Sequence, residues 1–438
     1  MSIIYWFRND LRLHDNPSLQ RAVAVAERQR VSLQPVFVHD PAWHSPTSWG
    51  FERTSRHRQA WWRMALDGLS EQLTALGSHL IELEGDPAAT LTELVRATRA
   101  QGVWSEAIDA PEEQDQDQQL HQAGTALHRH WQSSLIDPAE LPFPPDQVPD
   151  VFTSFRQAIE QAGVREAPVA NTLSSMPPPW HPPFLLEAWP AAPLHTPAPT
   201  HPPADPRSSF PWHEPAFHGG ERAALRHLHT YCQRRLPHTY KATRNALADT
   251  DASSKWSPWL ATGALSARQA MAAVRAFEDE HGASDSTYWL WFELLWRDHF
   301  RWLHHRFGRQ LYRQRGLLAQ APASTHAREA FHRWCEGQTG HDLIDAGMRE
   351  LAATGFLSNR MRQVVASYLI HDLGGDWRAG AAWFESRLID YDVYSNQGNW
   401  LYISGRGTDP RGGRRFNPDK QARDHDPEGH YRQRWLHP

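Results

Sequence analysis

The sequence predicts two differently built domains, an α/β domain over residues 1–138 and an all-α domain over residues 219–438. In the first domain, apolar runs alternate with helical patterns, which is typical of a doubly wound parallel sheet of five strands. After residue 219 helical patterns follow one another almost without interruption. A connector, residues 139–218, separates the domains, because residues 142–215 carry 19 of the 33 prolines, too many for a helix or a central strand.

The first domain is expected to hold its sheet between helices on both faces, joined by right-handed crossovers. No GxGxxG follows the first strand and no GxxxxGK occurs anywhere, so neither a classical dinucleotide site nor a P-loop is expected. The predicted strands are residues 2–7, 33–38, 79–83, 103–108 and 134–136, and the predicted helices between them are residues 57–76, 87–100 and 113–131.

The connector is expected to contain one short helix, at residues 151–163. In the second domain, residues 388–405 are expected to form a loop that is too apolar to be merely exposed. The predicted helices of that domain are residues 219–236, 257–279, 286–307, 327–337, 341–354, 358–373 and 377–389.

Composition excludes several classes of protein. No apolar run approaches the ~20 residues that a membrane-spanning helix needs, and charged residues come too early for a secretory leader. Two cysteines, Cys232 and Cys335, cannot build a disulfide framework or a cysteine-rich zinc site, and no histidine pair has an acidic partner at ligand spacing. We therefore expect a cytoplasmic protein without a metal site.

Charge and tryptophan content point to the second half as the binding half. Residues 1–220 hold 15 basic and 26 acidic side chains, whereas residues 221–438 hold 30 basic and 24 acidic ones. This asymmetry predicts contact with an anion, for which nucleic acid is one candidate. Eleven of the 21 tryptophans also lie after residue 221, which fits stacking on a planar ligand or electron transfer as well as core packing.

Four groups of residues in the second half could carry chemistry. Tyr240 and residues 253–257 (SSKWS) precede a proline-started helix, a pattern suited to binding phosphate, although a capping turn without a ligand has the same composition. Glu293, Trp296 and Arg297 share one helix face, which an ordinary buried ion pair beside an aromatic ring would also explain.

The third and fourth groups lie further along the chain. Asn359, Arg360 and Arg362 stand at a predicted helix start, where anions and polar ring edges can bind. Each of the four groups is weak alone, but together they suggest a cradle for one large ligand with polar and aromatic parts. The fourth group, within residues 388–405, consists of Asp390, Asp392, Asn396 and Trp400.

Nearly the whole chain resembles the photolyase/cryptochrome family. The motifs that carry the resemblance follow in the family's order: WFRNDLRLHDNP, SKWSPWLATGALS, FELLWRD, DAGMRELAATGFLSNRMRQ, DWRAGAAWFES and DYDVYSNQGNW. Three further stretches, PDVFTSFR, YKATRN and FNPDKQARDHDPEGHY, are similar to the DASH-type cryptochrome branch. Residues 164–215 are the least recognisable part.

The resemblance implies that FAD binds non-covalently in the helical domain. Arg362 and Asp390 would form a charged pair beside the flavin. Asn396 would face flavin N5, where an amide can hydrogen-bond to either protonation state. The full set of residues implied to bind FAD is Tyr240, Ser253, Ser254, Lys255, Trp256, Ser257, Glu293, Arg297, Asn359, Arg362, Asp390, Asp392 and Asn396.

The resemblance also implies repair of pyrimidine dimers in DNA by a protein that acts as a monomer. A dimer pairs badly, so it leaves the base stack cheaply, and single-stranded DNA would be the preferred substrate. Light absorbed by the reduced flavin would push one electron into the cyclobutane ring, which splits and returns it. Glu293, Trp296, Asn359 and Asn396 would be catalytic, and Trp296, Arg360, Gln363 and Tyr402 would contact DNA.

Two other functions are weighed against repair. A blue-light photoreceptor of the same family would bind DNA or a protein partner without significant repair. Glu293, Trp296 and Asn359 favour repair, and the sequence lacks the long C-terminal extension that signalling relatives use. A flavin oxidoreductase that works in the dark would need a nicotinamide-binding fingerprint, and none is found.

Electron supply and light harvesting complete the implied function. Trp400 and Trp377 match the inner and middle members of the family's tryptophan chain, but Ser324 stands where the outer tryptophan is usual, and Trp302 and Trp383 are candidates to replace it. Glu112 and Glu113 lie near the acid that holds a folate antenna, methenyltetrahydrofolate, in DASH relatives, although acidic loops are often only solvated.

Overall fold

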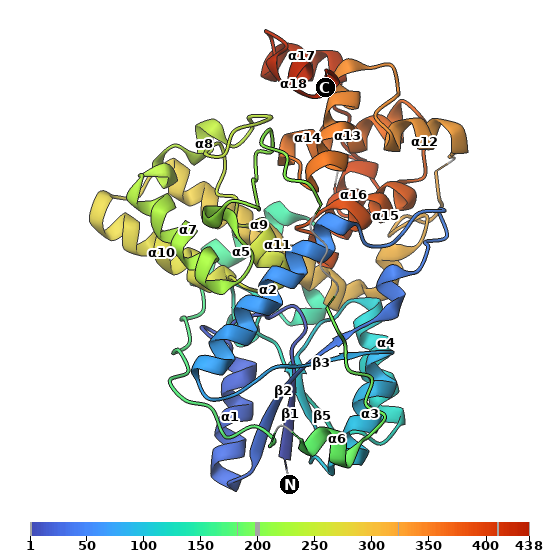
Figure 1. The fold of residues 1–438 in the computed structure, drawn as a ribbon. Coiled ribbons are helices and arrows are strands. Elements are labelled where there is room, and N and C mark those ends of the chain that lie inside the picture. The colour runs from blue at the N-terminus through green and yellow to red at the C-terminus, as the bar shows by residue number, and fades with distance from the viewer. Residues whose placement is uncertain (1, 182, 198–201, 323, 410, 438) are drawn as a thin grey trace.

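The computed structural model places an α/β layer beside a larger helical layer, with the N-terminus in the first and the C-terminus in the second (Figure 1). No helix in the described part of the chain is long and apolar enough to cross a membrane. The structure describes residues 2–181, 183–197, 202–322, 324–409 and 411–437.

The sheet of the α/β layer has five parallel strands in the order β3-β2-β1-β4-β5. Helices cover both of its faces, so the central strand β1 is buried along its whole length. The predicted doubly wound sheet is thereby confirmed. The strands are β1 (Ser2–Trp6), β2 (Ser32–His39), β3 (Ile81–Glu84), β4 (Val103–Glu106) and β5 (Leu127–His130).

One predicted strand is wrong. Residues 134–136 form no strand, and the fifth strand is β5, inside the stretch 113–131 that was predicted to be helical. As an edge strand, β5 (LHRH) is partly exposed and lacks the apolar run of a buried strand. Leu135 and Ile136 are buried for another reason, since their N–H groups donate to the buried Asp298 carboxylate at 2.8 and 2.9 Å.

The helices of the α/β layer match the predicted ones, with one addition. The structure adds α1, which begins after the N-cap Asn16 with a proline in its first turn. The helix predicted over 113–131 is shorter, because α4 ends at Gln122. The layer contains α1 (Pro17–Gln29), α2 (Arg56–Ala75), α3 (Pro87–Thr98) and α4 (Pro111–Gln122).

The connector is mostly irregular and contacts both layers: Leu194 makes an isolated bridge with Leu83 of β3, whereas Phe152 packs on Trp296 in the helical layer. The predicted short helix is present as α5 (Phe152–Gln161), and a five-residue helix, α6 (Phe184–Ala188), follows it.

The helical layer follows the predicted pattern, with two differences inside the predicted stretches and three short helices outside them, at residues 240–243, 418–425 and 430–436, that were not predicted. The helix predicted over 257–279 is two helices, because Gly263, in the left-handed region with φ of 70°, separates them. The main helices are α7 (Glu221–Gln233), α8 (Tyr240–Thr243), α9 (Ser257–Thr262), α10 (Ala267–His281), α11 (Asp285–Phe307), α12 (Arg328–Cys335), α13 (Asp342–Thr354), α14 (Asn359–His371), α15 (Trp377–Arg387), α16 (Val393–Ser404), α17 (Pro418–His425) and α18 (His430–Leu436).

The second difference concerns residues 388–405, predicted to be a loop. Most of this stretch is helix α16, with Asp392 as its N-cap and Gly405 in the left-handed conformation at its C-cap. Buried residues lie on several sides of this helix, Gln397 and Gly398 among them, so the sequence shows no amphipathic period from which a surface helix could be predicted.

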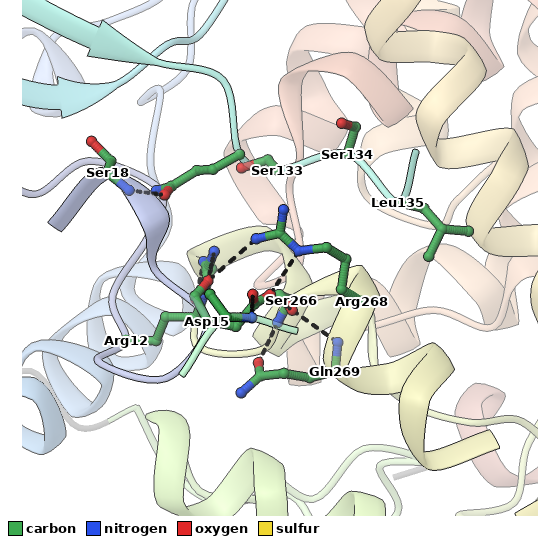
Figure 2. A network of polar contacts seen from close by, with 12 residues as sticks. Arg12, Asp15, Ser18, Ser133, Ser134, Leu135, Ser266, Arg268 and Gln269 are labelled. Atoms are coloured by element: carbon green, nitrogen blue, oxygen red, sulfur yellow. Dashed lines mark hydrogen bonds and ion pairs between the residues drawn. The ribbon is translucent and has the colours of Figure 1, made fainter. Parts of the chain in front are cut away.

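The two layers are joined by a buried polar network (Figure 2). The Asp15 carboxylate, fully buried in the loop after β1, accepts hydrogen bonds from Ser266 Oγ at 2.5 Å and Arg268 Nε at 2.9 Å, both on the helical side. Arg12 donates in turn to the carbonyl of Gly263 at 2.9 Å. No side chain fits at residue 263, because a Cβ there would lie 1.9 Å from the carbonyl oxygen of Asn9.

Two further buried carboxylates accept hydrogen bonds across the junction between the layers. Glu221, at the start of α7, accepts the backbone N–H groups of Leu13 and His14 at 2.9 and 2.8 Å. Asp298, on α11, accepts those of residues 135 and 136. Each carboxylate satisfies donors that would otherwise be buried without partners, so the junction fixes both layers in one arrangement.

Replacing Asp15 with alanine should strongly destabilise the protein. Arg268, whose side chain is 8% exposed, would lose its buried partner, and breaking such a pair costs about 3–5 kcal/mol. The free energy of unfolding in urea measures the effect. Asp67→Ala, which removes the exposed end of a surface pair with Arg63, should cost no more than about 1 kcal/mol. Equal losses in the two variants would contradict the importance of the junction.

Candidate functional site

Two adjoining cavities open in the helical layer. The larger, of about 490 Å³, lies among α8, α9, α11, α14 and α16, and the smaller, of about 80 Å³, lies among α14, α15 and α16. Both are lined by Asn359, Arg362 and Gln363. All thirteen residues predicted to bind FAD line one or both cavities, and Trp296, Arg360, Gln363 and Tyr402 line the larger one.

The loop before α9 supplies a buried cation and an unpaired donor to the larger cavity. Lys255 is 4% exposed and takes a left-handed conformation with φ of 58°. Burial lowers the pKa of its ammonium group to about 8, although the nearby Glu350 opposes the shift. The buried Trp256 indole N–H has no partner among the described residues. This loop can therefore hold an anionic group, as the residues at 253–257 predicted.

Arg362 and Asp390 form the predicted charged pair between the cavities. Arg362 Nη2 lies 2.8 Å from Asp390 Oδ2, and Arg362 Nε donates to the carbonyl of Leu357 at 2.9 Å. The Asp390 side chain is fully buried, and its second oxygen, Oδ1, accepts no hydrogen bond within the described parts of the chain. A buried carboxylate oxygen without a donor fits a ligand that brings an N–H or O–H group.

Asp392 connects the smaller cavity to α11. As the N-cap of α16 it accepts the N–H of Ser395 at 2.8 Å, and Arg301 Nη2 lies 3.1 Å from its Oδ2. Burial alone would raise the pKa of Asp392, but the guanidinium groups of Arg301 and Arg297 hold it well below the usual range. The carboxylate therefore stays charged and keeps both arginines in place.

The amide side chains of the site are held differently. Asn396 Nδ2 donates to the carbonyl of Ala381 at 3.0 Å, which orients its amide at the smaller cavity. Asn359 is exposed as the first residue of α14, whose N-cap is Ser358. It is therefore accessible to a ligand in either cavity.

Glu293 lies at the wall of the larger cavity in an ion pair with Arg244. Burial raises the pKa of the Glu293 carboxyl, while Arg244 opposes the rise. The Arg244 guanidinium also lies over the ring of Trp289 at 4.4 Å. Sequence reasoning missed Arg244 as a site residue; the signal was its place in the motif YKATRN, but its pairing is visible only in three dimensions.

Trp296 forms an aromatic wall of the same cavity. It stacks on Phe152 of α5, with ring centroids 3.7 Å apart and planes 12° apart, and meets Tyr402 edge-on at 5.6 Å. Arg414 lies over the Tyr402 ring at 4.9 Å, and Arg360 Nη2 donates to Asn245 Oδ1 at 2.8 Å. Phe152 was also missed, because it comes from the connector, far away in the sequence.

Of the two predicted electron-transfer residues, only Trp400 reaches a cavity. Trp400 is 2% exposed, lines the smaller cavity and packs so tightly on Gly380 that a Cβ there would lie 2.2 Å from its ring. Trp377 is buried outside both cavities, and its indole N–H donates to the carbonyl of Gln314 at 3.0 Å.

A third cavity, of about 490 Å³, lies between the layers and contains both predicted antenna residues. Glu112 is exposed and pairs with Arg53 at 2.6 Å. Glu113 differs, because burial raises its pKa and its Oε2 finds no donor in the described structure. Tyr391, with the Arg58 guanidinium 4.5 Å over its ring, forms the opposite side.

One group with metal-ligand spacing occurs among the described residues, although no metal was predicted. His39, Glu82 and His195 place possible ligand atoms within 4.8 Å of one another. Arg63, however, holds both oxygens of Glu82, at 2.6 and 2.8 Å. This ion pair accounts for the carboxylate without a metal ion, and the prediction of no metal stays a prediction.

Comparisons with known proteins agree with the fold and the cavities. The "DNA photolyase" family matches residues 3–174 and "FAD binding domain of DNA photolyase" matches residues 289–438. Cryptochrome DASH of Synechocystis sp. is 40% identical, with 99% of this chain and 87% of the relative covered. Cryptochrome DASH of Xenopus laevis is 39% identical, with 99% of this chain and 82% of the relative covered.

Solved structures give the same result. The Synechocystis sp. cryptochrome superposes with a TM-score of 0.90 at 38% identity, covering 99% of this chain and 88% of the other. A bacterial class III photolyase from Agrobacterium tumefaciens superposes with a TM-score of 0.79 at 27% identity, covering 99% of this chain and 86% of the other.

The fold, the cavities and these matches define a flavoprotein with an α/β domain and a helical FAD-binding domain. Its relatives are similar over nearly the full length. The chain belongs to the DASH cryptochromes of the photolyase/cryptochrome family. The predicted domain boundaries at residues 138 and 218 stay predictions.

Replacing Asp390 with asparagine should weaken FAD binding. The change keeps the side-chain volume but leaves the Arg362 guanidinium without its partner charge beside the cavities, which costs several kcal/mol. The ratio of flavin to protein absorbance after purification measures the effect. Asp372→Asn, at a surface pair with Arg415, serves as the control and should keep its FAD. A full complement of FAD in the Asp390 variant would contradict the assignment of this pair.

Proposed function

We propose that this protein repairs cyclobutane pyrimidine dimers in single-stranded DNA under blue light. The observation that carries the proposal is the adjacency of two predicted sets of residues, one for FAD and one for the dimer, around the same joined cavities. Adjacent sites allow an electron to pass directly between the two bound groups.

The cavities suit FAD on chemical grounds. Lys255 and the loop before α9 would hold its phosphates, and the free oxygen of Asp390 would accept a hydrogen bond from the flavin or the adenosine. Asn396, with its amide fixed by Ala381, would face flavin N5. When bound, FAD supplies the light-excited electron donor.

The wall opposite suits a flipped dimer. Trp296 is held rigidly by Phe152 and offers an aromatic platform for the dimer's bases. Glu293, whose pKa burial raises, would donate a hydrogen bond to a base carbonyl once protonated. Arg360, Gln363 and Tyr402 would contact the DNA around the dimer.

The proposed preference for single-stranded DNA follows from the free energy needed to flip the dimer out of the base stack. Flipping a dimer out of a duplex costs a few kcal/mol that a single strand does not require. Tyr402, which meets Trp296 edge-on, is one of the aromatic walls of the pocket, and we propose that contacts with this pocket do not recover that cost.

We propose that the protein acts as a cytoplasmic monomer.

The cavity between the layers is proposed to hold the antenna, methenyltetrahydrofolate. Glu113 supports this better than Glu112, because its buried carboxyl is raised in pKa and can donate or accept a hydrogen bond to a pterin ring edge. Glu112 is exposed and occupied by Arg53.

Repair of a dimer in a single-stranded oligonucleotide tests the proposed function. The reduced, illuminated protein should split the dimer, with weak or absent repair in a duplex. Glu293→Ala and Trp296→Ala should abolish it, since loss of base stacking alone costs about 1–3 kcal/mol. Glu280→Ala, at an exposed carboxylate of α10, should repair as the wild type does.

Dimers left intact by the reduced wild type in single-stranded DNA would exclude repair. The photoreceptor function, a light-dependent contact with DNA or a protein partner, would then take its place.

Photoreduction of the flavin without DNA tests the electron supply. Trp377→Phe should slow it strongly, because phenylalanine is far harder to oxidise than tryptophan, whereas Ser324→Trp should leave the rate equal or raise it. The decay of oxidised-flavin absorbance under blue light gives both rates. If Trp377→Phe photoreduces at the wild-type rate, electrons enter by a route that avoids this residue.

A further inference from the structure

The segment that carries Ser324 has no indole of its own but is tied closely to the start of α15. Ser324 Oγ donates to the carbonyl of Gly374 at 2.9 Å, and the N–H groups of Thr325 and His326 donate to the same carbonyl at 3.2 and 3.1 Å. Because this segment contains no tryptophan, a residue that replaces the outer tryptophan of the chain must come from another part of the sequence.

Trp49, from the α/β layer, lies against this segment. Its ring is 5.0 Å from that of His326 in an edge-on contact at 71°. The neighbouring Gly50 lies close to the side chain of Arg328: a Cβ built on Gly50 would be 3.7 Å from Arg328 Nη2. A tight turn holds the indole there, with the Thr47 N–H donating to the carbonyl of Phe51 at 2.7 Å. Trp49 is half-buried, so solvent reaches it.

His326 joins Trp49 to the middle tryptophan. Its Nδ1 accepts the N–H of Asp376 at 3.1 Å, and Asp376 is the residue before Trp377. Burial lowers the pKa of His326, which favours the neutral imidazole. A neutral ring beside Trp49 does not oppose the positive charge that an indole gains when it loses an electron.

A series of ring contacts also packs the same histidine against the residues around the smaller cavity. The Trp400 ring is 5.1 Å from that of Phe384, which stacks on Trp334 at 6.3 Å. Trp334 stacks on Phe331 at 5.9 Å, and the Phe331 ring is 5.3 Å from that of His326. These contacts fix the position of His326, but Phe384 and Phe331 are too hard to oxidise to carry the electron, so the route to Trp49 runs through Trp377.

The two tryptophans suggested by the sequence are less suitable. Trp302 stacks on Trp131 at 4.6 Å and packs in a different core cluster from Trp377 and Trp400. Trp383 is 8% exposed, and the Arg387 guanidinium lies 4.2 Å over its ring. A fixed cation at that distance disfavours a second positive charge on the same ring.

We propose that Trp49 is the outer electron donor of this protein, in place of the tryptophan missing at position 324. The inference rests on the proposed photoreduction of FAD. For each electron that passes inward to the photoexcited flavin, the Trp49 indole loses one electron and then its N–H proton to solvent. An external thiol then returns one electron and one proton to Trp49 and is itself oxidised.

The test is photoreduction of the FAD-loaded full chain in the presence of a thiol, without DNA. Trp49→Phe should slow the reaction at least about tenfold, equivalent to about 1.4 kcal/mol of added barrier. Trp104→Phe is the matched control, because this half-buried indole stacks on His128 in the sheet, and it should keep the wild-type rate. Ser324→Trp in the Trp49→Phe background should restore the rate.

Electron paramagnetic resonance provides a readout other than rate. With the ring hydrogens of tryptophan deuterated, illumination should give a solvent-exposed tryptophan radical in the wild type that Trp49→Phe removes and Trp104→Phe retains. A Trp49→Phe variant with wild-type rate and radical would overturn the proposal. Repair by wild-type protein reduced chemically with dithionite needs no electron from Trp49, so that assay tests the proposed function separately.

Discussion

The structure depends on buried carboxylates that must find partners across the junction of its two layers. Asp15 is the clearest case, because its charge lies in the loop between β1 and α1 but its donors, Ser266 and Arg268, come from the helical layer. Neither layer can bury its half of this network alone without a large desolvation cost. The junction therefore couples the α/β sheet to the position of α10 and, through Asp298, to α11.

This coupling continues into the flavin cavities. Helix α11 carries Asp298 toward the α/β layer, and its arginines hold the N-cap Asp392 of α16. Helix α16 in turn carries Asn396 and Trp400 along the smaller cavity. A displacement of the junction would thus move the groups that line the smaller cavity, because the ion pairs between these elements have little freedom once buried.

The connector and the loop after β2, which lie outside the helical layer, also contribute to the candidate site. The connector places Phe152 under Trp296 and so fixes the aromatic wall of the larger cavity. The loop after β2 brings Trp49 to the segment that contains Ser324. The proposed function therefore draws on both layers and the connector, although the residues that line the two cavities all come from the helical layer.

The sequence by itself determined the two-layer fold and the number of strands in the sheet, and it pointed to residues that line the two cavities, because apolar periodicity and ordered motifs are local properties of the chain. It misplaced the fifth strand and missed α16, since an edge strand has little apolar pattern and a helix buried on several sides has no amphipathic one. Only the tertiary structure decided the pairing of Arg244 with Glu293, the stacking of Phe152 on Trp296 and the approach of Trp49 to His326. These contacts join residues from separate elements, and their geometry arises from packing that no local pattern encodes.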